Sequence, residues 1–168
     1  MSDASAPTTG MLVIGDEILS GRTVDANLAY AAPRLAALGA PLGEVRVIPD
    51  IIPVIVDAIH ALCAGSAQVI TSGGIGPTHD DRTAEAVATA FGRPLERSAD
   101  AEARLRAHIG ADQINAARLK MADVPAGATL IDNPVSAAPG FQVENVYVMA
   151  GVPWSFQAMF DAVAPSFS

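Results

Sequence analysis

Cysteine, aromatic residues and positive charge are all scarce in this sequence of 168 residues. Its only cysteine, Cys63, rules out an internal disulfide and a cysteine-based metal site. Aromatic residues make up 5% of the chain and hydrophobic residues 51%. We therefore expect an aliphatic, alanine-rich core, as forms when helices pack on a sheet of valine and isoleucine.

The shortage of positive charge restricts the partners of the protein. Ten Lys and Arg residues face 18 Asp and Glu residues, which gives a net charge of −8. Such a surface repels nucleic acid and anionic membranes. A phosphorylated ligand would need local compensation from backbone N–H groups, a helix N-terminus or a divalent cation.

Long apolar runs are absent as well. No stretch approaches the roughly 18 residues of a membrane span, and the first ten residues lack the basic start and apolar core of a signal peptide. We therefore expect a cytoplasmic protein. The length and the lack of repeats or linkers predict one domain over residues 11–168, and the small, polar residues 1–10 predict a flexible tail.

Apolar patterning predicts an α/β fold. Short apolar runs typical of buried strands cover residues 11–14, 45–48 and 68–71. Apolar residues spaced by three and four predict helices after them, over about 24–38, 52–62 and 83–91. Further helices are expected between 98 and 121, a turn at 124–128, a strand at 129–131, a hairpin at 141–149 turning at Asn145, and a last helix ending near 164. This order predicts a three-layer α/β/α sandwich with a mostly parallel sheet joined by right-handed crossovers.

Unusual loops follow four of the predicted strands, where parallel sheets bind their ligands. They are Gly15–Gly21 with Asp25 and Asn27 beyond it, Pro49-Asp50, Thr71–Asp81 and Ala150–Pro153. Asp16 and Glu17 fit a solvated turn and a site equally well. Asp50 is in position to cap the next helix, which we favour over a ligand role.

The loop after the third strand, Ser72–Asp81, is the strongest signal. Its three glycines can turn backbone N–H groups inward, and the next helix directs its positive end to the same place. Asp80 and Asp81 follow; one can cap that helix, or the two can hold a divalent ion against a pyrophosphate. The loop matches neither the Walker pattern nor the dinucleotide fingerprint, and His79 is more typical of a hydrogen-bonded loop residue than of a base.

Taken together, these motifs resemble the molybdopterin-binding superfamily of molybdenum-cofactor biosynthesis, and most closely its branch known as the N-terminal domain of competence/damage-inducible protein A. The matching segments are Gly15–Gly21 with Asp25 and Asn27, Ser72–Thr83, Ala138–Phe141 and Gly151–Pro153. Ser136-Ala137, where the family commonly has Gly-Thr, and Ala150, in place of the usual proline, depart from the pattern. The competence proteins also carry an amidase domain, to which this resemblance does not extend.

The resemblance implies roles for particular residues. Ser72–Gly76 would hold phosphate, Asp50, Asp80 and Asp81 would be the acidic, catalytic residues, and Asp80 and Asp81 would bind a divalent metal, Mg or Co. The ligand-binding residues would be Gly15, Asp16, Glu17, Ser72, Gly73, Gly74, Gly76, Pro77, Thr78, Ser136, Pro139, Gly140, Gly151 and Pro153.

Three functional hypotheses follow from the resemblance. The first is a protein that binds molybdopterin, or a related pterin or nucleotide phosphate, for cofactor biosynthesis or handling. The second is a metal-dependent pyrophosphatase acting on ADP-ribose-like nucleotides, and the third is a non-catalytic oligomeric scaffold of the same fold. Whether the protein is an enzyme stays open; molybdopterin nucleotidyl or molybdate transfer is the other possible reaction. A homo-oligomer, a trimer or a dimer, is expected from the relatives.

Overall fold

The computed structural model describes residues 7–167 of the chain. In chain order the elements are β1 (Thr9–Ile14), α1 (Asp16–Leu19), α2 (Asn27–Ala37), β2 (Leu42–Ile48), α3 (Ile52–Gly65), β3 (Gln68–Ser72), α4 (Thr83–Ala90), β4 (Leu95–Arg97), α5 (Ala99–His108), η1 (Ala111–Gln113), α6 (Ala116–Leu119), η2 (Lys120–Ala122), β5 (Asp123–Pro125), β6 (Thr129–Ile131), β7 (Gly140–Val143), β8 (Val146–Met149), α7 (Pro153–Val163) and η3 (Ala164–Phe167).

Six strands form the central sheet, in the order β2-β1-β3-β8-β7-β6. The β2, β1, β3 and β8 strands pair in parallel, whereas β7 pairs antiparallel with both β8 and β6. Glu144 and Asn145 separate β7 from β8, so the hairpin predicted around Asn145 is confirmed. The sheet is mostly parallel, as the alternation of strands and helices predicts.

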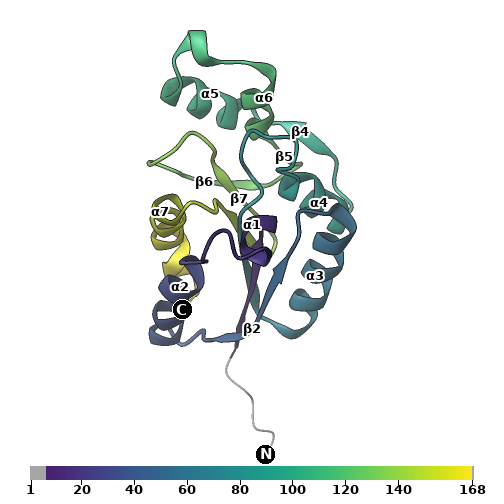
Figure 1. The fold of residues 1–168 in the computed structure, drawn as a ribbon, viewed down its shortest axis with the longest axis vertical. Coiled ribbons are helices and arrows are strands. Elements are labelled where there is room, and N and C mark those ends of the chain that lie inside the picture. The colour runs from purple at the N-terminus through teal and green to yellow at the C-terminus, as the bar shows by residue number, and fades with distance from the viewer. Residues whose placement is uncertain (1–6, 168) are drawn as a thin grey trace, which may run out of the picture.

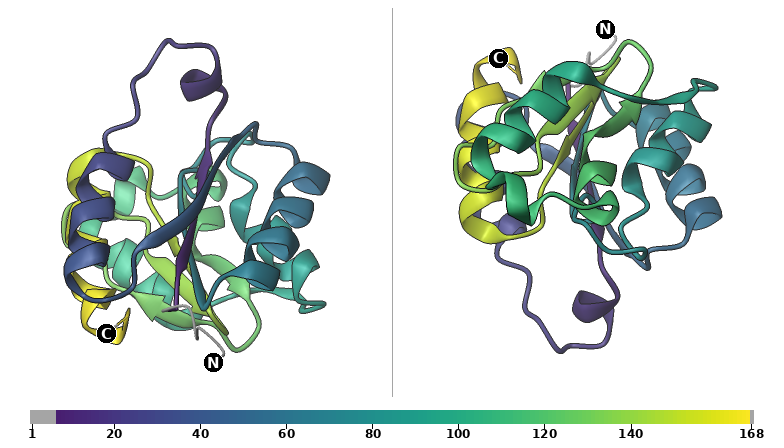
Figure 2. Two further views of the ribbon diagram at one scale, coloured as in Figure 1. Left: turned by 90° about the horizontal axis from the view of Figure 1, so that it is seen from below. Right: turned by 90° about the horizontal axis from the view of Figure 1, so that it is seen from above.

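Helices cover both faces of the sheet and complete the three predicted layers. Figure 1 shows α3 and α4 on one side and α2 with α7 on the other, and both views in Figure 2 agree. Ile55, Ile59 and Leu62 of α3 are fully buried against the first face, and Phe156 and Phe160 of α7 against the second. Burying one such side chain contributes about 1.5–3 kcal/mol, so the two apolar faces hold the sheet between its helices.

Strand β1 begins earlier than the sequence predicts. The predicted flexible tail falls largely on residues 1–6, which lie outside the described residues, but its last two residues, Thr9 and Gly10, are buried in β1. The Thr9 hydroxyl donates to the Ala40 carbonyl at 2.9 Å, and its N–H donates to Pro41 at 2.9 Å. These hydrogen bonds satisfy a polar residue inside the sheet, which a purely apolar criterion for strands overlooks.

Two further boundaries differ from the prediction. Helix α2 begins at Asn27 rather than near Val24, because the Asp25 carboxylate accepts the N–H of Leu28 at 2.9 Å and stops the helix from extending backwards. Val24 is 88% exposed on the loop that projects from the body of the domain in Figure 2. The predicted turn at 124–128 begins as strand β5, in which Val124 pairs with Glu96 of β4.

Candidate functional site

A cleft of about 650 Å³ lies at the carboxyl ends of the parallel strands. Five segments distant in sequence line it: α1 with the loop after it, the loop after β3, η2, residues 136–138, and the loop after β8 with the start of α7. Its lining residues are Glu17, Thr23, Gly73, Gly74, Ile75, Gly76, Pro77, Asp81, Met121, Ser136, Ala137, Ala138, Ala150, Gly151, Val152, Pro153 and Trp154. Its size falls within the usual range of small-molecule sites, roughly 300–1,000 Å³.

The loop after β3 takes a backbone conformation that only glycine adopts readily. Gly73 has φ +98° and Gly74 has φ +75°. A Cβ on Gly73 would collide with the Ile14 carbonyl at the end of β1, and one on Gly74 with the Thr83 hydroxyl. The two glycines therefore let the loop pass close to β1 and to the start of α4, and they leave backbone rather than side chains on the cleft wall.

Thr83, at the start of α4, secures the base of this loop. Its buried hydroxyl donates to the Gly73 carbonyl at 3.0 Å, and its N–H donates to the Gly74 carbonyl at 3.1 Å. The loop after β8 approaches from the other side, where a Cβ on Gly151 would lie 3.1 Å from the Gly73 Cα. Backbone packing from both sides holds the glycine loop in place.

Asp50 does not line the cleft but lies against Gly74 of the glycine loop, and it does not cap the helix that follows it. Helix α3 has Ile51 at its N-cap and no side-chain capping bond, so the cap interpretation is wrong. The Asp50 carboxylate instead accepts the backbone N–H of Arg82, just before α4, and its Oδ1 faces Gly74. That Oδ1 is buried without a hydrogen-bond partner.

Burial and neighbouring negative charge raise the pKa of Asp50 from 3.8 to about 6. Loss of solvation is the largest cause, followed by the charge of Asp81, and Asp16 and Glu17 add smaller repulsions. The hydrogen bond from Arg82 lowers the pKa but does not outweigh these effects. The structure thus brings together four predicted acidic residues from three separate places in the sequence.

Asp80 and Asp81 point to different places. The Asp81 Oδ2 accepts hydrogen bonds from the Thr78 N–H at 2.9 Å and the Thr78 hydroxyl at 2.8 Å, and Asp81 lines the cleft. The Asp80 side chain is 70% exposed, lies 3.4 Å from His79 and does not line the cleft. Over residues 7–167, no three His, Cys, Asp or Glu side chains form a ready metal cage, so metal binding by this pair stays a prediction.

Most of the other predicted ligand residues lie on the cleft wall or next to it in the chain. Those on the cleft wall are Glu17, Gly73, Gly74, Gly76, Pro77, Ser136, Gly151 and Pro153. Asp16 in α1, Ser72 at the end of β3 and Thr78 in the loop after β3 are each next in the chain to a residue of the cleft wall. Gly15 is buried, and its N–H donates to the Ile48 carbonyl of β2 at 3.0 Å. Gly140 lies inside β7, where a Cβ would collide with the Val148 carbonyl, so its position is accounted for by packing of the sheet.

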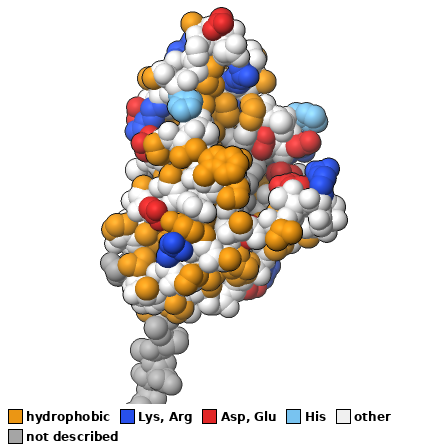
Figure 3. Space-filling view, turned by 60° about the vertical axis from the view of Figure 1, so that its left-hand side comes forward, with side chains coloured by type: hydrophobic (Ala, Val, Ile, Leu, Met, Phe, Trp, Pro, Cys, Tyr) orange, Lys and Arg blue, Asp and Glu red, His pale blue; other side chains and the backbone are white. Residues whose placement is uncertain are grey.

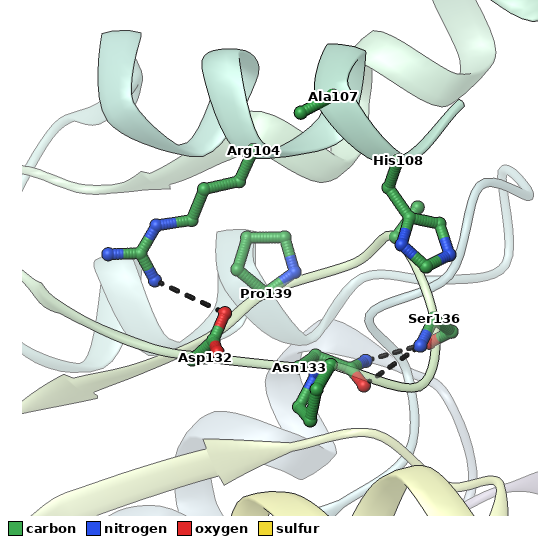
Figure 4. Close-up of a pocket in the computed structure, with 9 residues that line it drawn as sticks. Arg104, Ala107, His108, Asp132, Asn133, Ser136 and Pro139 are labelled. Carbon is green, nitrogen blue, oxygen red and sulfur yellow. Dashed lines mark hydrogen bonds and ion pairs between the residues drawn. The ribbon is translucent and has the colours of Figure 1, made fainter. Parts of the chain in front are cut away.

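A smaller pocket adjoins the cleft and shares Ser136 and Ala137 with it. This pocket, of about 280 Å³, lies between α5 and the loop 132–139 (Figure 4). The buried Asn133 amide donates to the Ser136 hydroxyl at 2.7 Å and to the Ala138 carbonyl at 2.8 Å. Arg104 lies 3.8 Å from Asp132 across the mouth, and Pro139, a predicted ligand residue, is part of this wall. Asn133 therefore shapes the loop that separates the two pockets.

Sequence reasoning missed Lys120, which contacts the loop after β3 from η2. Its Nζ donates to the carbonyl oxygens of Thr78 at 2.9 Å and Asp81 at 2.7 Å. It is the only lysine in the chain, and about 40 residues separate it from the loop, so no local pattern indicated this contact. The lysine ties the small unit of β4, β5, α5 and α6 to one wall of the cleft.

Replacing Lys120 with methionine is expected to loosen the loop at residues 76–83. Removing two charge-assisted hydrogen bonds at a half-buried site should cost about 1–2 kcal/mol of local stability. Amide hydrogen exchange in the loop should therefore accelerate roughly tenfold. Arg118→Met is the matched control, because among the described residues the Arg118 side chain donates hydrogen bonds only to Gln113 nearby. Equal exchange rates in the two variants would contradict this role of Lys120.

The comparison with protein families agrees with this arrangement. A family model described as a probable molybdopterin binding domain matches residues 10–168. The chain belongs to this family.

No helix over the described residues is long and apolar enough to cross a membrane. Figure 3 shows one face of the molecule, on which hydrophobic side chains are widespread and acidic side chains are scattered among them.

Relatives extend the match to individual proteins and structures. The chain is 39% identical to a CinA-like protein of Citrifermentans bemidjiense over 157 residues, which are 90% of this chain and 38% of that protein. The crystal structure of a CinA protein of unknown function from Thermoplasma acidophilum superposes with a TM-score of 0.91 at 34% identity, covering 97% of this chain and 99% of the other.

The fold also matches more distant structures. The tungsten cofactor synthesizing protein MoaB from Pyrococcus furiosus gives a TM-score of 0.63 at 16% identity, covering 96% of this chain and 92% of the other. This similarity concerns the fold alone. The chain spans from 38% to 67% of the length of the curated relatives it matches.

Proposed function

We propose that this protein binds molybdopterin, or a closely related pterin or nucleotide phosphate, in the cleft at the carboxyl ends of β1, β3 and β8. The observation that carries this proposal is the glycine loop, where Gly73 and Gly74 leave backbone in place of side chains on the cleft wall. Bare backbone next to a helix start is a common setting for phosphate. Membership of the molybdopterin-binding family supports the pterin over other phosphate esters and connects the protein with cofactor biosynthesis or handling.

The acidic neighbours of the loop set a condition on this binding. Asp50, Asp81 and Glu17 lie at or near the same cleft, so a phosphate group would be repelled unless a cation or bound protons offset their charge. We therefore propose that a divalent cation, Mg or Co, accompanies the phosphorylated ligand. The partnerless Oδ1 of Asp50 is a suitable oxygen for such a hard cation.

Calorimetric titration tests the proposal directly, with molybdopterin and its adenylylated form as ligands, with and without Mg²⁺. Gly76→Ala should weaken binding about tenfold, because its Cβ would lie 2.9 Å from the Asp81 Oδ2 and would displace that side chain in the cleft. Gly65→Ala is the matched control, since no atom lies within 4 Å of the added methyl group. Absence of binding at micromolar concentrations would refute the proposal and leave the pyrophosphatase and the oligomeric scaffold as the remaining hypotheses.

The acidic group also favours a second candidate, a metal-dependent pyrophosphatase acting on ADP-ribose-like nucleotides. The metal, when bound, would polarise the phosphoryl oxygens and activate a water molecule. Asp81 would hold the metal at the cleft in either of two arrangements. In the one that the sequence predicts, Asp80 is the second metal ligand. In the other, the second ligand is Asp50, which lies against the glycine loop in the structure.

Two adjacent variants distinguish these arrangements in an assay of AMP release from ADP-ribose with Mg²⁺ or Co²⁺. Asp81→Asn should lower the rate by roughly 10–100-fold or more, the scale on which losing a group that supports a metal acts. Asp80→Asn should leave the rate nearly unchanged, because its side chain points to solvent. An equal loss in both variants would support the Asp80/Asp81 pair predicted from the sequence, and no loss in either would refute the hydrolytic mechanism.

A further inference from the structure

Trp154 is a large aromatic side chain that the fold leaves uncovered at the cleft. It is the only tryptophan in the chain, and it is 64% exposed. It lies in the first turn of α7 and lines the cleft together with Val152 and Pro153. Exposed hydrophobic side chains that gather at a cleft commonly mark a binding surface.

The position of Trp154 on α7 explains why the core does not cover it. The buried apolar side chains of this helix, Phe156, Met159 and Phe160, share one face because they are spaced by three and four residues. Trp154 precedes Phe156 by two residues, which places it about 200° around the helix, on the opposite side. The same turn of α7 thus directs one aromatic residue into the core and the other toward the cleft mouth.

Within residues 7–167 no other ring or cation stacks on the Trp154 indole, and no protein acceptor bonds to its Nε1. Five other aromatic residues contact one another: Tyr30, Tyr147, Phe156, Phe160 and Phe167. Small apolar side chains, Ala137, Ala138 and Ala150, share the cleft lining with Trp154. This apolar wall leaves room for a flat molecule beside the indole.

We propose that Trp154 stacks on the planar heteroaromatic ring of the ligand while the phosphate lies at the glycine loop. The proposal rests on the phosphate binding proposed above. It adds recognition of the ring of the ligand, which contacts to the phosphate alone do not distinguish. It assigns the ligand to phosphate esters that carry a flat nitrogen heterocycle, such as a pterin or a purine. Stacking on an aromatic side chain suits such rings because their faces are apolar and polarisable.

The test compares ligands with and without a ring in the wild-type protein and in Trp154→Ala and Trp154→Phe. Calorimetry with ADP-ribose, molybdopterin and inorganic pyrophosphate, each with Mg²⁺, should show that Trp154→Ala weakens the two ring-bearing ligands roughly 5- to 150-fold, the range for loss of one stacked base. Pyrophosphate affinity should not change, and Trp154→Phe should recover much of the loss. Because no other tryptophan is present, quenching of indole fluorescence by ADP-ribose should report the stack in the wild type.

Leu95→Ala is the control, since Leu95 is a 40% exposed hydrophobic residue on β4, away from the cleft lining. Equal affinities of wild type and Trp154→Ala for ADP-ribose and molybdopterin would overturn the stacking role. A parallel loss of pyrophosphate binding would overturn it too, because the indole would then only support the loop. A change in sedimentation without a change in affinity would assign Trp154 to a protein interface. If the wild type binds pyrophosphate but neither ring-bearing ligand, the stacking proposal is refuted while phosphate binding at the glycine loop is supported. If the wild type binds none of the three ligands, both proposals are refuted.

Discussion

Gly73→Ala is expected to lower the free energy of unfolding by roughly 2–5 kcal/mol, as the sum of two costs. The first is the left-handed backbone at φ +98°, which an L side chain adopts only with strain. The second is the collision of the new methyl group with the Ile14 carbonyl, which belongs to the central sheet and has little freedom to move. Because the same backbone forms the cleft wall, ligand binding should be lost along with the stability.

Gly39→Ala separates the two costs. Gly39 ends α2 with φ +79°, but no atom lies within 4 Å of an added Cβ. This variant should lose only the backbone term, roughly 1–2 kcal/mol. Denaturant unfolding monitored by circular dichroism gives both values. If the two variants lose equal stability, the close approach of the glycine loop to β1 does not determine its conformation.

Asp50→Asn is expected to stabilise the protein at pH 7.5, by about 1–3 kcal/mol, while it weakens binding of the cation and of the phosphorylated ligand. The ionised carboxylate of Asp50 is partly desolvated and repelled by Asp81, Asp16 and Glu17, which is why its pKa rises to about 6. A neutral amide of the same shape avoids both costs. A residue that destabilises the folded state at neutral pH is typical of a functional site rather than of a structural one.

The pH dependence of unfolding tests whether the Asp50 carboxylate causes this difference in stability. Because its pKa is higher in the folded protein than in the unfolded chain, where it is near 3.8, the folded state binds the proton more tightly between pH 4 and 6. The Asp50 contribution to stability therefore falls as the pH rises through this window, and it is at its lowest above pH 6. Unfolding experiments at pH 4, 5, 6 and 7.5 should show that the free energy of unfolding of Asp50→Asn rises relative to that of the wild type as the pH increases. A constant difference at all four pH values would contradict this assignment.

The sequence alone predicted the mostly parallel α/β architecture and the strand ends at which the cleft lies, for physical reasons that are local. The buried strands at residues 11–14 and 68–71 consist of apolar runs, and their alternation with helices allows only parallel pairing through crossovers. Glycines directly after a strand indicate a special loop conformation, and Gly73 and Gly74 do adopt backbone conformations that other residues avoid. Motifs whose meaning depends on backbone conformation can therefore be interpreted from neighbouring residues.

Only the tertiary structure decided how the charged and aromatic side chains meet. In the sequence Asp50 has the appearance of a cap for α3, and 32 residues separate it from Arg82, whose N–H it accepts. Asp80 and Asp81 are neighbours in the chain, yet one points to solvent and the other to the cleft. Lys120 and Trp154 reach the site from other elements, and no local pattern predicts a contact made by the packing of distant segments. The glycine loop is a local feature of the chain, whereas the charge and the apolar wall around it exist only in the folded domain.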